Sequence, residues 1–210
     1  MGLAVSAFAV EKPELDQRLQ TITEKFTAMQ QNPDTRVPAN YLAAAKGIVL
    51  IDRTGGAFII GGHSGYGVAL TRDKAGNWSA PSFVSTVGAS LGLQIGGTRD
   101  FFVVLAMTPG AAETLKQSSI DFGAQASATG GTESTGAETS TKATPQVVIY
   151  SQNKGYYAGA SLKGGSVKED ADANSVYYSR NVSAADIFSG QVTTSPAGDV
   201  LIKEIERYSH

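Results

Sequence analysis

From Gly47 onward, apolar residues stand in short unbroken runs separated by glycine-rich turns, and this pattern constrains the fold most. Residues 47–51 and 101–107 have the length and composition of buried strands. The turn 72–77 separates two more such runs, 66–70 and 82–87, and shorter runs occur at 57–60, 91–95, 146–150 and 156–162. With 24 glycines in the chain, this arrangement is typical of strands joined by tight turns. We expect an antiparallel β-sheet that is strongly bent or closed into a barrel.

The segment before these strands has the repeat of an amphipathic helix. Leu15, Leu19, Ile22, Phe26 and Met29 recur at alternating steps of four and three residues, which places them on one stripe of a helix over 13–31. Short helices are expected at 39–46, 109–116 and 170–179, with a helix start at 183–186 and a final helix over 196–208. The predicted fold class is therefore α+β, with an N-terminal amphipathic helix and short peripheral helices outside the sheet.

The chain has the size of one domain, which we place at 13–210. Residues 129–144 are nearly all Gly, Ser, Thr, Ala and Glu, but strand-like residues resume at once, so we interpret them as an excursion within the domain. Residues 1–12 are expected to be a flexible N-terminus or the remainder of a signal peptide, because the apolar run before Glu11 ends in Ala7-Phe8-Ala9. We accordingly expect a periplasmic or secreted location.

Charge and composition exclude several kinds of function. The chain has 17 basic and 19 acidic residues, so it lacks the broad positive field that nucleic acid binding needs. Membrane binding would have to use a local cationic patch or apolar insertion. With no cysteine and only two widely separated histidines, we expect no metal site and no cofactor.

The segment Gly88-Ala89-Ser90-Leu91-Gly92 matches the G-x-S-x-G motif of serine hydrolases. That motif requires a helix after the serine and a histidine base. The residues that follow Ser90 are poor helix formers, His63 precedes the serine, and the only later histidine is His210. We therefore expect no enzyme activity, and a hydrolase based on Ser90 is kept as an alternative.

Several ordered motifs resemble one known family. They are Gly55-Gly56-Ala57-Phe58-Ile59-Ile60-Gly61-Gly62, Gly65-Tyr66-Gly67-Val68, Asn77-Trp78-Ser79-Ala80-Pro81-Ser82-Phe83, Gly92-Leu93-Gln94-Ile95-Gly96 and Asp186-Ile187-Phe188-Ser189-Gly190. Between about Val37 and Gln191 the chain resembles the SYLF domain family. This resemblance implies a non-catalytic lipid-binding module, with phosphoinositides as ligands of eukaryotic members, actin patches associated with yeast members, and export common among bacterial members.

The expected partner is a phospholipid membrane surface or another amphiphile. The turn before Trp78 supplies Arg72 and Lys74 for phosphates, and the indole of Trp78 suits the headgroup boundary. Arg53 and Lys154 are further cationic candidates. Two alternatives stay open: Trp78 is a core anchor of the domain, or the chain is an envelope structural or protein-interaction module whose partner binds the stripe of the N-terminal helix.

Overall fold

The computed structural model describes residues 10–53, 63–87, 101–121, 146–153, 155–157 and 166–210. The helices in these ranges are α1 (Lys12–Gln31), α2 (Ala39–Ala44), α3 (Pro109–Glu113), α5 (Ala171–Tyr177), α6 (Ala184–Phe188) and α7 (Pro196–Arg207), with one turn of 3-10 helix, η1 (Thr114–Lys116). Each lies where the sequence predicts a helix. The expected strands at 57–60 and 91–95, Ser90 and the signal-like start fall outside the described residues.

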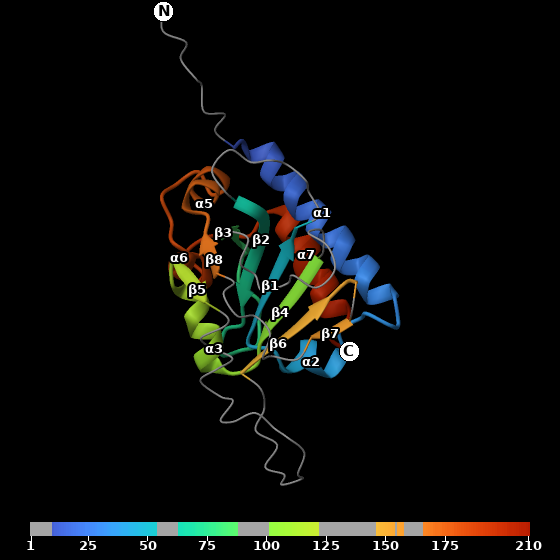
Figure 1. The fold of residues 1–210 in the computed structure, drawn as a ribbon. Helices are drawn as coiled ribbons and strands as arrows, with labels where there is room; N and C mark the ends of the chain where they lie inside the picture. The colour runs from blue at the N-terminus through green and yellow to red at the C-terminus, as the bar shows by residue number, and fades with distance from the viewer. Residues whose placement is uncertain (1–9, 54–62, 88–100, 122–145, 154, 158–165) are drawn as a thin grey trace, which may run out of the picture.

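The strands form a curled antiparallel sheet, as the alternation of apolar runs and turns predicts (Figure 1). They are β1 (Gly47–Asp52), β2 (His63–Thr71), β3 (Ser82–Val87), β4 (Phe101–Ala106), β5 (Ser119–Asp121), β6 (Val147–Ser151), β7 (Gly155–Tyr157) and β8 (Ser166–Glu169). Their order across the sheet is β5-β8-β3-β2-β1-β4-β6-β7. Since β5 and β7 are the two edges of the described sheet, it is bent but open rather than a closed barrel.

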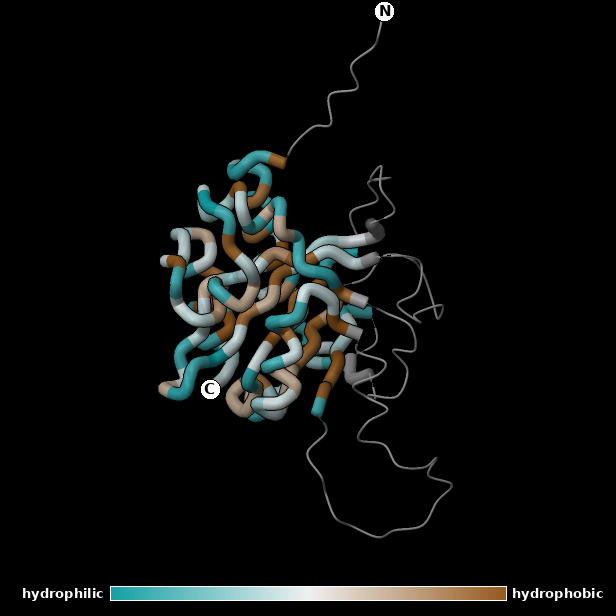
Figure 2. Tube along the Cα trace, turned by 90° about the vertical axis from the view of Figure 1, so that its left-hand side faces the viewer, coloured by the Kyte–Doolittle hydropathy of each residue, from teal (hydrophilic) through white to brown (hydrophobic). Residues whose placement is uncertain are grey.

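Hydrophobic residues cover both faces of the sheet, which explains why its central strands are apolar throughout. Along β1, Ile48 and Leu50 face a core formed with α1, α2, α5 and α7. The alternate residues Val49 and Ile51 face a second core formed with α3, η1 and α6. Figure 2 shows hydrophobic segments in the middle of the molecule and hydrophilic ones on its outside.

The register of the central strands depends on a close approach at Gly67. Gly67 lies opposite Ile51 in the β1–β2 pair, and a Cβ atom at this position would overlap the carbonyl oxygen of Leu50. The irregular pairing between His63 and Gly65 adds a local bend to β2. Glycine therefore permits the tight pairing of β2 with β1.

Capping side chains fix the helix starts in the C-terminal part of the chain. Asp170 caps α5 by accepting a hydrogen bond from the backbone N–H of Ala173. Ser183 and Asp186 form a reciprocal capping box at the start of α6, which confirms the helix start predicted there. Ser195 caps α7, and Pro196 occupies its first turn.

Candidate functional site

A surface cavity of about 410 Å³ lies where the starts of α1 and α7 meet the end of α5. Its lining consists of Lys12, residues 177–180 and residues 191–196. These three pieces bring two cationic side chains, Lys12 and Arg180, to one hollow, and the lining contains no acidic side chain. Two cations thus line one cavity in a chain whose net charge is −2.

The backbone around α5 and α7 shapes this cavity. α5 ends at Tyr177, and Ser179 then takes the left-handed conformation with φ 53°. That conformation is uncommon for a residue other than glycine, and it turns the chain between Tyr178 and Arg180. On the opposite wall, the amino end of α7 begins at Pro196, and the partial positive charge of a helix start favours an anion nearby.

The floor of the cavity is held by the phenol of Tyr177. Its hydroxyl donates to Oδ1 of Asp16 at 2.7 Å and shares a short hydrogen bond with Oγ of Ser195. Burial raises the pKa of Tyr177, so the phenol stays protonated at neutral pH and remains a donor to Asp16. Through these contacts α1, α5 and the cap of α7 are held in fixed positions around the cavity.

Two exposed cations border the cavity. The Nζ of Lys12 lies 5.4 Å from the centre of the Tyr177 ring, and Nη1 of Arg180 donates to the carbonyl oxygen of Gln191 at 3.3 Å. Both side chains have further donors for a phosphate, and such charge-assisted hydrogen bonds are stronger than neutral ones. The lining includes no His, Asp, Glu or Cys that could act as a general base. The arrangement of two cations beside a helix start is suited to binding an anion.

The residues expected to contact lipid fall in a different place. Arg72 stacks on Trp78, with its guanidinium carbon 4.4 Å from the ring centre, and Nη1 donates to the carbonyl oxygen of Ala43 at 3.0 Å. Burial lowers the pKa of Arg72, and the negative charge of Glu206 opposes that shift. Trp78 is 8% exposed and belongs to the core that contains α1, as the core-anchor alternative predicts. Arg72 and Trp78 thus join the β2–β3 turn to the core.

The other expected contacts do not gather around that turn. Lys74 is exposed at its tip, where Asp73 accepts a hydrogen bond from the backbone N–H of Asn77 at 2.9 Å. Arg53 follows β1, whereas Arg72 follows β2. Because these strands are antiparallel, the two arginines lie at opposite ends of the strand pair. Lys154 lies outside the described residues.

The apolar stripe of α1 is also unavailable to a partner. Leu15, Leu19, Ile22 and Phe26 are 0% exposed and Met29 is 1% exposed, because the stripe packs against the sheet, α5 and α7. The expectation that a partner binds this stripe is therefore wrong. Only the opposite face of α1 can contact another molecule.

A buried polar cluster attaches the middle of α1 to the sheet. The carboxylate of Asp52, at the end of β1, is 1% exposed and lies 2.7 Å from Nζ of Lys25. The hydroxyl of Tyr66 donates to the same oxygen at 3.0 Å, and Arg18 stacks on the Tyr66 ring at 5.2 Å. Burial and the charge of Asp52 raise the pKa of Tyr66 to about 12. This cluster fixes the orientation of α1 and so of the cavity at its start.

Sequence reasoning did not identify Lys12, Arg180 or Ser195 as site residues. Ser195-Pro196 is recognisable as a helix start, but nothing in the sequence relates it to Lys12 or to Arg180. Among the described residues, none of the helices combines the length and apolar character needed to cross a membrane. The same part of the chain contains no cluster of three or more His, Cys, Asp or Glu arranged to hold a metal ion.

Comparison with known proteins shows one consistent similarity. Residues 87–208 match the family model described as Ysc84, Las17-binding protein actin regulator. LAS seventeen-binding protein 3 of Saccharomyces cerevisiae is 33% identical over 178 residues, which are 82% of this chain and 39% of that protein. SH3 domain-containing YSC84-like protein 1 of Homo sapiens is 27% identical over 181 residues, 84% of this chain and 53% of that protein. The chain thus spans between two fifths and about half of the length of these relatives.

Proposed function

The chain belongs to the Ysc84 family, the family of the SYLF domain, and we propose that it is a non-catalytic module that binds phospholipid through a phosphate-bearing headgroup. The observation that carries the proposal is the cationic cavity, where Lys12 and Arg180 border the amino end of α7 and the lining has no acidic side chain. Lipid binding is also what the sequence resemblance implies. The cavity replaces the β2–β3 turn as the favoured contact.

The size and charge of the cavity support a headgroup as its ligand. A volume of about 410 Å³ lies within the usual range for small-molecule sites. Lys12 is a flexible point charge, whereas Arg180 offers a planar pair of donors that matches phosphate oxygens. Their exposure makes the interaction dependent on ionic strength, because salt screens exposed charges.

Vesicle co-sedimentation tests this proposal. Phosphatidylcholine vesicles with and without phosphatidylinositol 4-phosphate are compared for the natural protein and for a Lys12→Ala/Arg180→Ala variant. We expect the variant to bind the phosphoinositide vesicles about tenfold more weakly, since each lost exposed contact weakens binding only modestly and the two act together. A Lys74→Ala/Lys203→Ala variant removes two exposed lysines away from the cavity and is the matched control.

The outcomes separate binding at the cavity from binding elsewhere. Loss of binding only in the Lys12/Arg180 variant supports the cavity, and loss only in the Lys74/Lys203 variant places binding outside the cavity and contradicts the proposal. Equal loss in both variants would indicate general charge attraction without a site. Inorganic phosphate, added as a competitor, tests whether the phosphate alone is recognised. If the natural protein binds neither kind of vesicle, the proposed function is refuted.

Absence of catalysis belongs to the same proposal. The relatives are named for binding or for the domains they contain, and the cavity lining has no His, Asp, Glu or Cys side chain. A panel of carboxylic and phosphate esters should show no turnover above background. Hydrolysis that disappears in a Ser90→Ala variant would establish the hydrolase alternative instead.

A further inference from the structure

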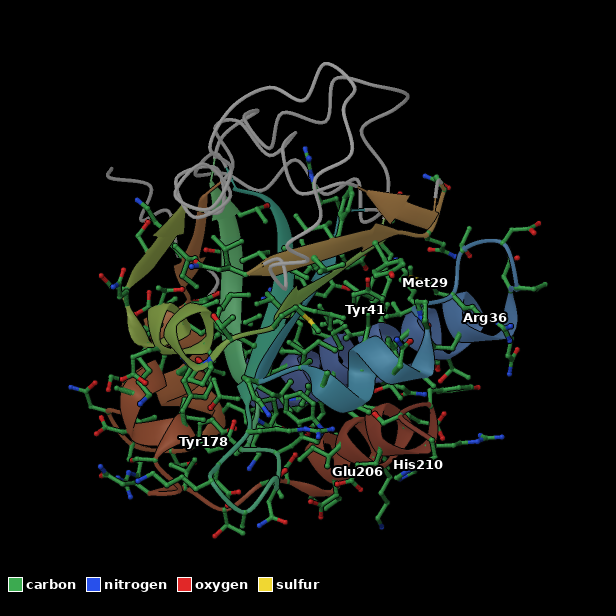
Figure 3. The ribbon with its side chains drawn as sticks, turned by 90° about the horizontal axis from the view of Figure 1, so that it is seen from below. Met29, Arg36, Tyr41, Tyr178, Glu206 and His210 are labelled. Carbon is green, nitrogen blue, oxygen red and sulfur yellow. The ribbon has the colours of Figure 1, made fainter. Side chains whose placement is uncertain are left out.

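The outer face of α1 and the adjoining face of α7 form a groove beside the cationic cavity, with Pro196 in the lining of both. The two helices run parallel, so that Thr23 lies near Val200 and the hydroxyl of Thr27 donates to Glu204 at 3.2 Å. Figure 1 shows the two helices together beside the sheet, and Figure 3 shows α7, which contains Glu206, along the blue helices, with His210 just beyond its end. A hollow of about 880 Å³ between them continues into another of about 400 Å³.

The floor of this groove is apolar. Val200 is 53% exposed, and it is the only large hydrophobic side chain that the described residues leave exposed. Around it lie Pro13, Pro196, Ala197 and, in the continuation, Ala28. A single exposed valine on a convex surface would be unremarkable. Here it lies in a concave hollow that has room for a larger apolar side chain.

The rim of the groove is acidic. Asp16, Glu24 and Glu204 line it, and the one cation in the lining, Arg207, pairs with Glu204 at 3.4 Å. The basic residues in the middle of α1 are directed elsewhere. Lys25 pairs with Asp52, and Arg18 stacks on Tyr66. The negative rim disfavours an anionic membrane and favours a partner that carries positive charge.

We propose that this groove binds a basic amphipathic helix of a partner protein. From Pro13 to Gln31 the α1 wall of the groove is about 27 Å long at 1.5 Å per residue, and the 12 residues of α7 border about 17 Å of it, which is enough for about three turns of a helix held between both walls. A third helix laid along two parallel ones buries an apolar stripe at steps of three and four residues. Its large apolar side chain fills the hollow beside Val200, while flanking Lys or Arg side chains meet Glu24 and Asp16.

The groove and the cationic cavity make independent predictions. The cavity recognises an anion and the groove recognises a cationic, apolar helix, so failure of one leaves the other untouched. Glu24 is a suitable residue to change, because it is exposed and its carboxylate accepts only an exposed hydrogen bond from Gln20 at 3.0 Å. Glu113 is the matched control. It is exposed on α3, which packs on the opposite face of the sheet from α1 and α7, and it pairs with Lys116.

The experiment uses two synthetic helical peptides of about 18 residues, the length of the α1 wall of the groove. Both have the same leucine stripe, and their polar positions are lysine in one and glutamate in the other. Fluorescence anisotropy measures their binding to the full chain. We expect the basic peptide to bind and the acidic one to bind at least tenfold more weakly, because the rim attracts one and repels the other.

Variants locate the binding. Glu24→Lys should lower the affinity for the basic peptide about fivefold, because an exposed attraction becomes a repulsion, and Glu113→Lys should leave that affinity unchanged. Val200→Ala should lower the affinity about tenfold, because it removes two carbons from the contact. Circular dichroism melts confirm that each variant is folded.

Three outcomes would overturn the proposal. They are equal affinity for the two peptides, equal loss in Glu24→Lys and Glu113→Lys, and no effect of Val200→Ala. Sedimentation velocity adds a fourth. If the chain dimerises and Val200→Asp returns it to a monomer, the groove is covered by a second copy of the chain rather than by a partner helix.

Discussion

Replacing Asn174 with leucine tests how the C-terminal segments are attached to the sheet. Asn174 lies in α5 and is 0% exposed. Its Oδ1 accepts a hydrogen bond from the backbone N–H of Phe83 at 2.7 Å. Its Nδ2 donates to Oγ of Ser82 at 3.1 Å and to Oε1 of Glu169 at 3.3 Å. The amide therefore binds α5 to β3 and to the end of β8.

The expected cost follows from these three contacts. Each hydrogen bond contributes about 1 kcal/mol net, and a buried N–H left without an acceptor costs about 1–3 kcal/mol. Phe83 loses such an acceptor, whereas Glu169 still accepts from the N–H of Ala184 at 2.6 Å. We expect Asn174→Leu to lower the free energy of unfolding by about 3 kcal/mol, or the midpoint of thermal unfolding by about 6–12 °C for a chain of this size.

Urea unfolding followed by circular dichroism measures this loss. Asn181→Leu is the matched control, because Asn181 is exposed; its midpoint should change little. Asn174→Ala separates lost hydrogen bonds from overpacking, since alanine cannot overfill the site. Hydrogen exchange should be faster at the amide of Phe83 in both Asn174 variants. A stability within about 0.5 kcal/mol of the natural protein for Asn174→Ala would refute the reasoning.

Two further predictions concern the β1–β2 pair. Gly67→Ala should lower the free energy of unfolding by about 2 kcal/mol, because the added methyl group must displace the carbonyl of Leu50; an unchanged urea midpoint would contradict this close approach. Tyr66 has its pKa raised to about 12, and an unfolded tyrosine has a pKa near about 10. Between these pH values the folded chain keeps a proton that the unfolded chain releases, so stability should fall as pH rises. Tyr66→Phe, which loses the hydrogen bond to Asp52, should show a shallower alkaline decline in urea midpoint; an identical slope would exclude Tyr66 as its source.

The elements with strong periodicity could be predicted from sequence. The stripe from Leu15 to Met29 specifies α1, and the run in β1 specifies a buried strand. An element that is buried on one or both faces needs apolar residues at the positions that face a core, and this spacing can be read from the sequence. Strands β5 and β8 could not be predicted. β5 has three residues, and β8, Ser166-Val167-Lys168-Glu169, is mostly polar. Their pairing with each other and with β3 is set by tertiary contacts.

The candidate site could be predicted only in kind. The sequence indicated cations beside polar turns, but it could not show that Arg72 stacks on Trp78 inside a hydrophobic contact. The sequence also could not show that Lys12 and Arg180 lie close together in space, since they are far apart along the chain and each alone resembles an ordinary surface residue. Their proximity follows from the packing of α1 against both α5 and α7, which no local pattern encodes.

The pairing of α1 with α7 has a consequence for how the chain matures during translation. Thr27 and Glu204, which are bonded across this pair, are separated by 177 positions, and the ring of Phe26 packs edge-on against that of Tyr208 at 6.1 Å. The ribosome makes α1 well before α7, so a nascent chain must keep the stripe of α1 partly uncovered until α7 has been made. Such exposed surface is what chaperones recognise and what drives aggregation of incomplete chains. A stop codon placed within α7 should therefore yield an aggregation-prone, protease-sensitive product, although every described strand of the sheet precedes α7.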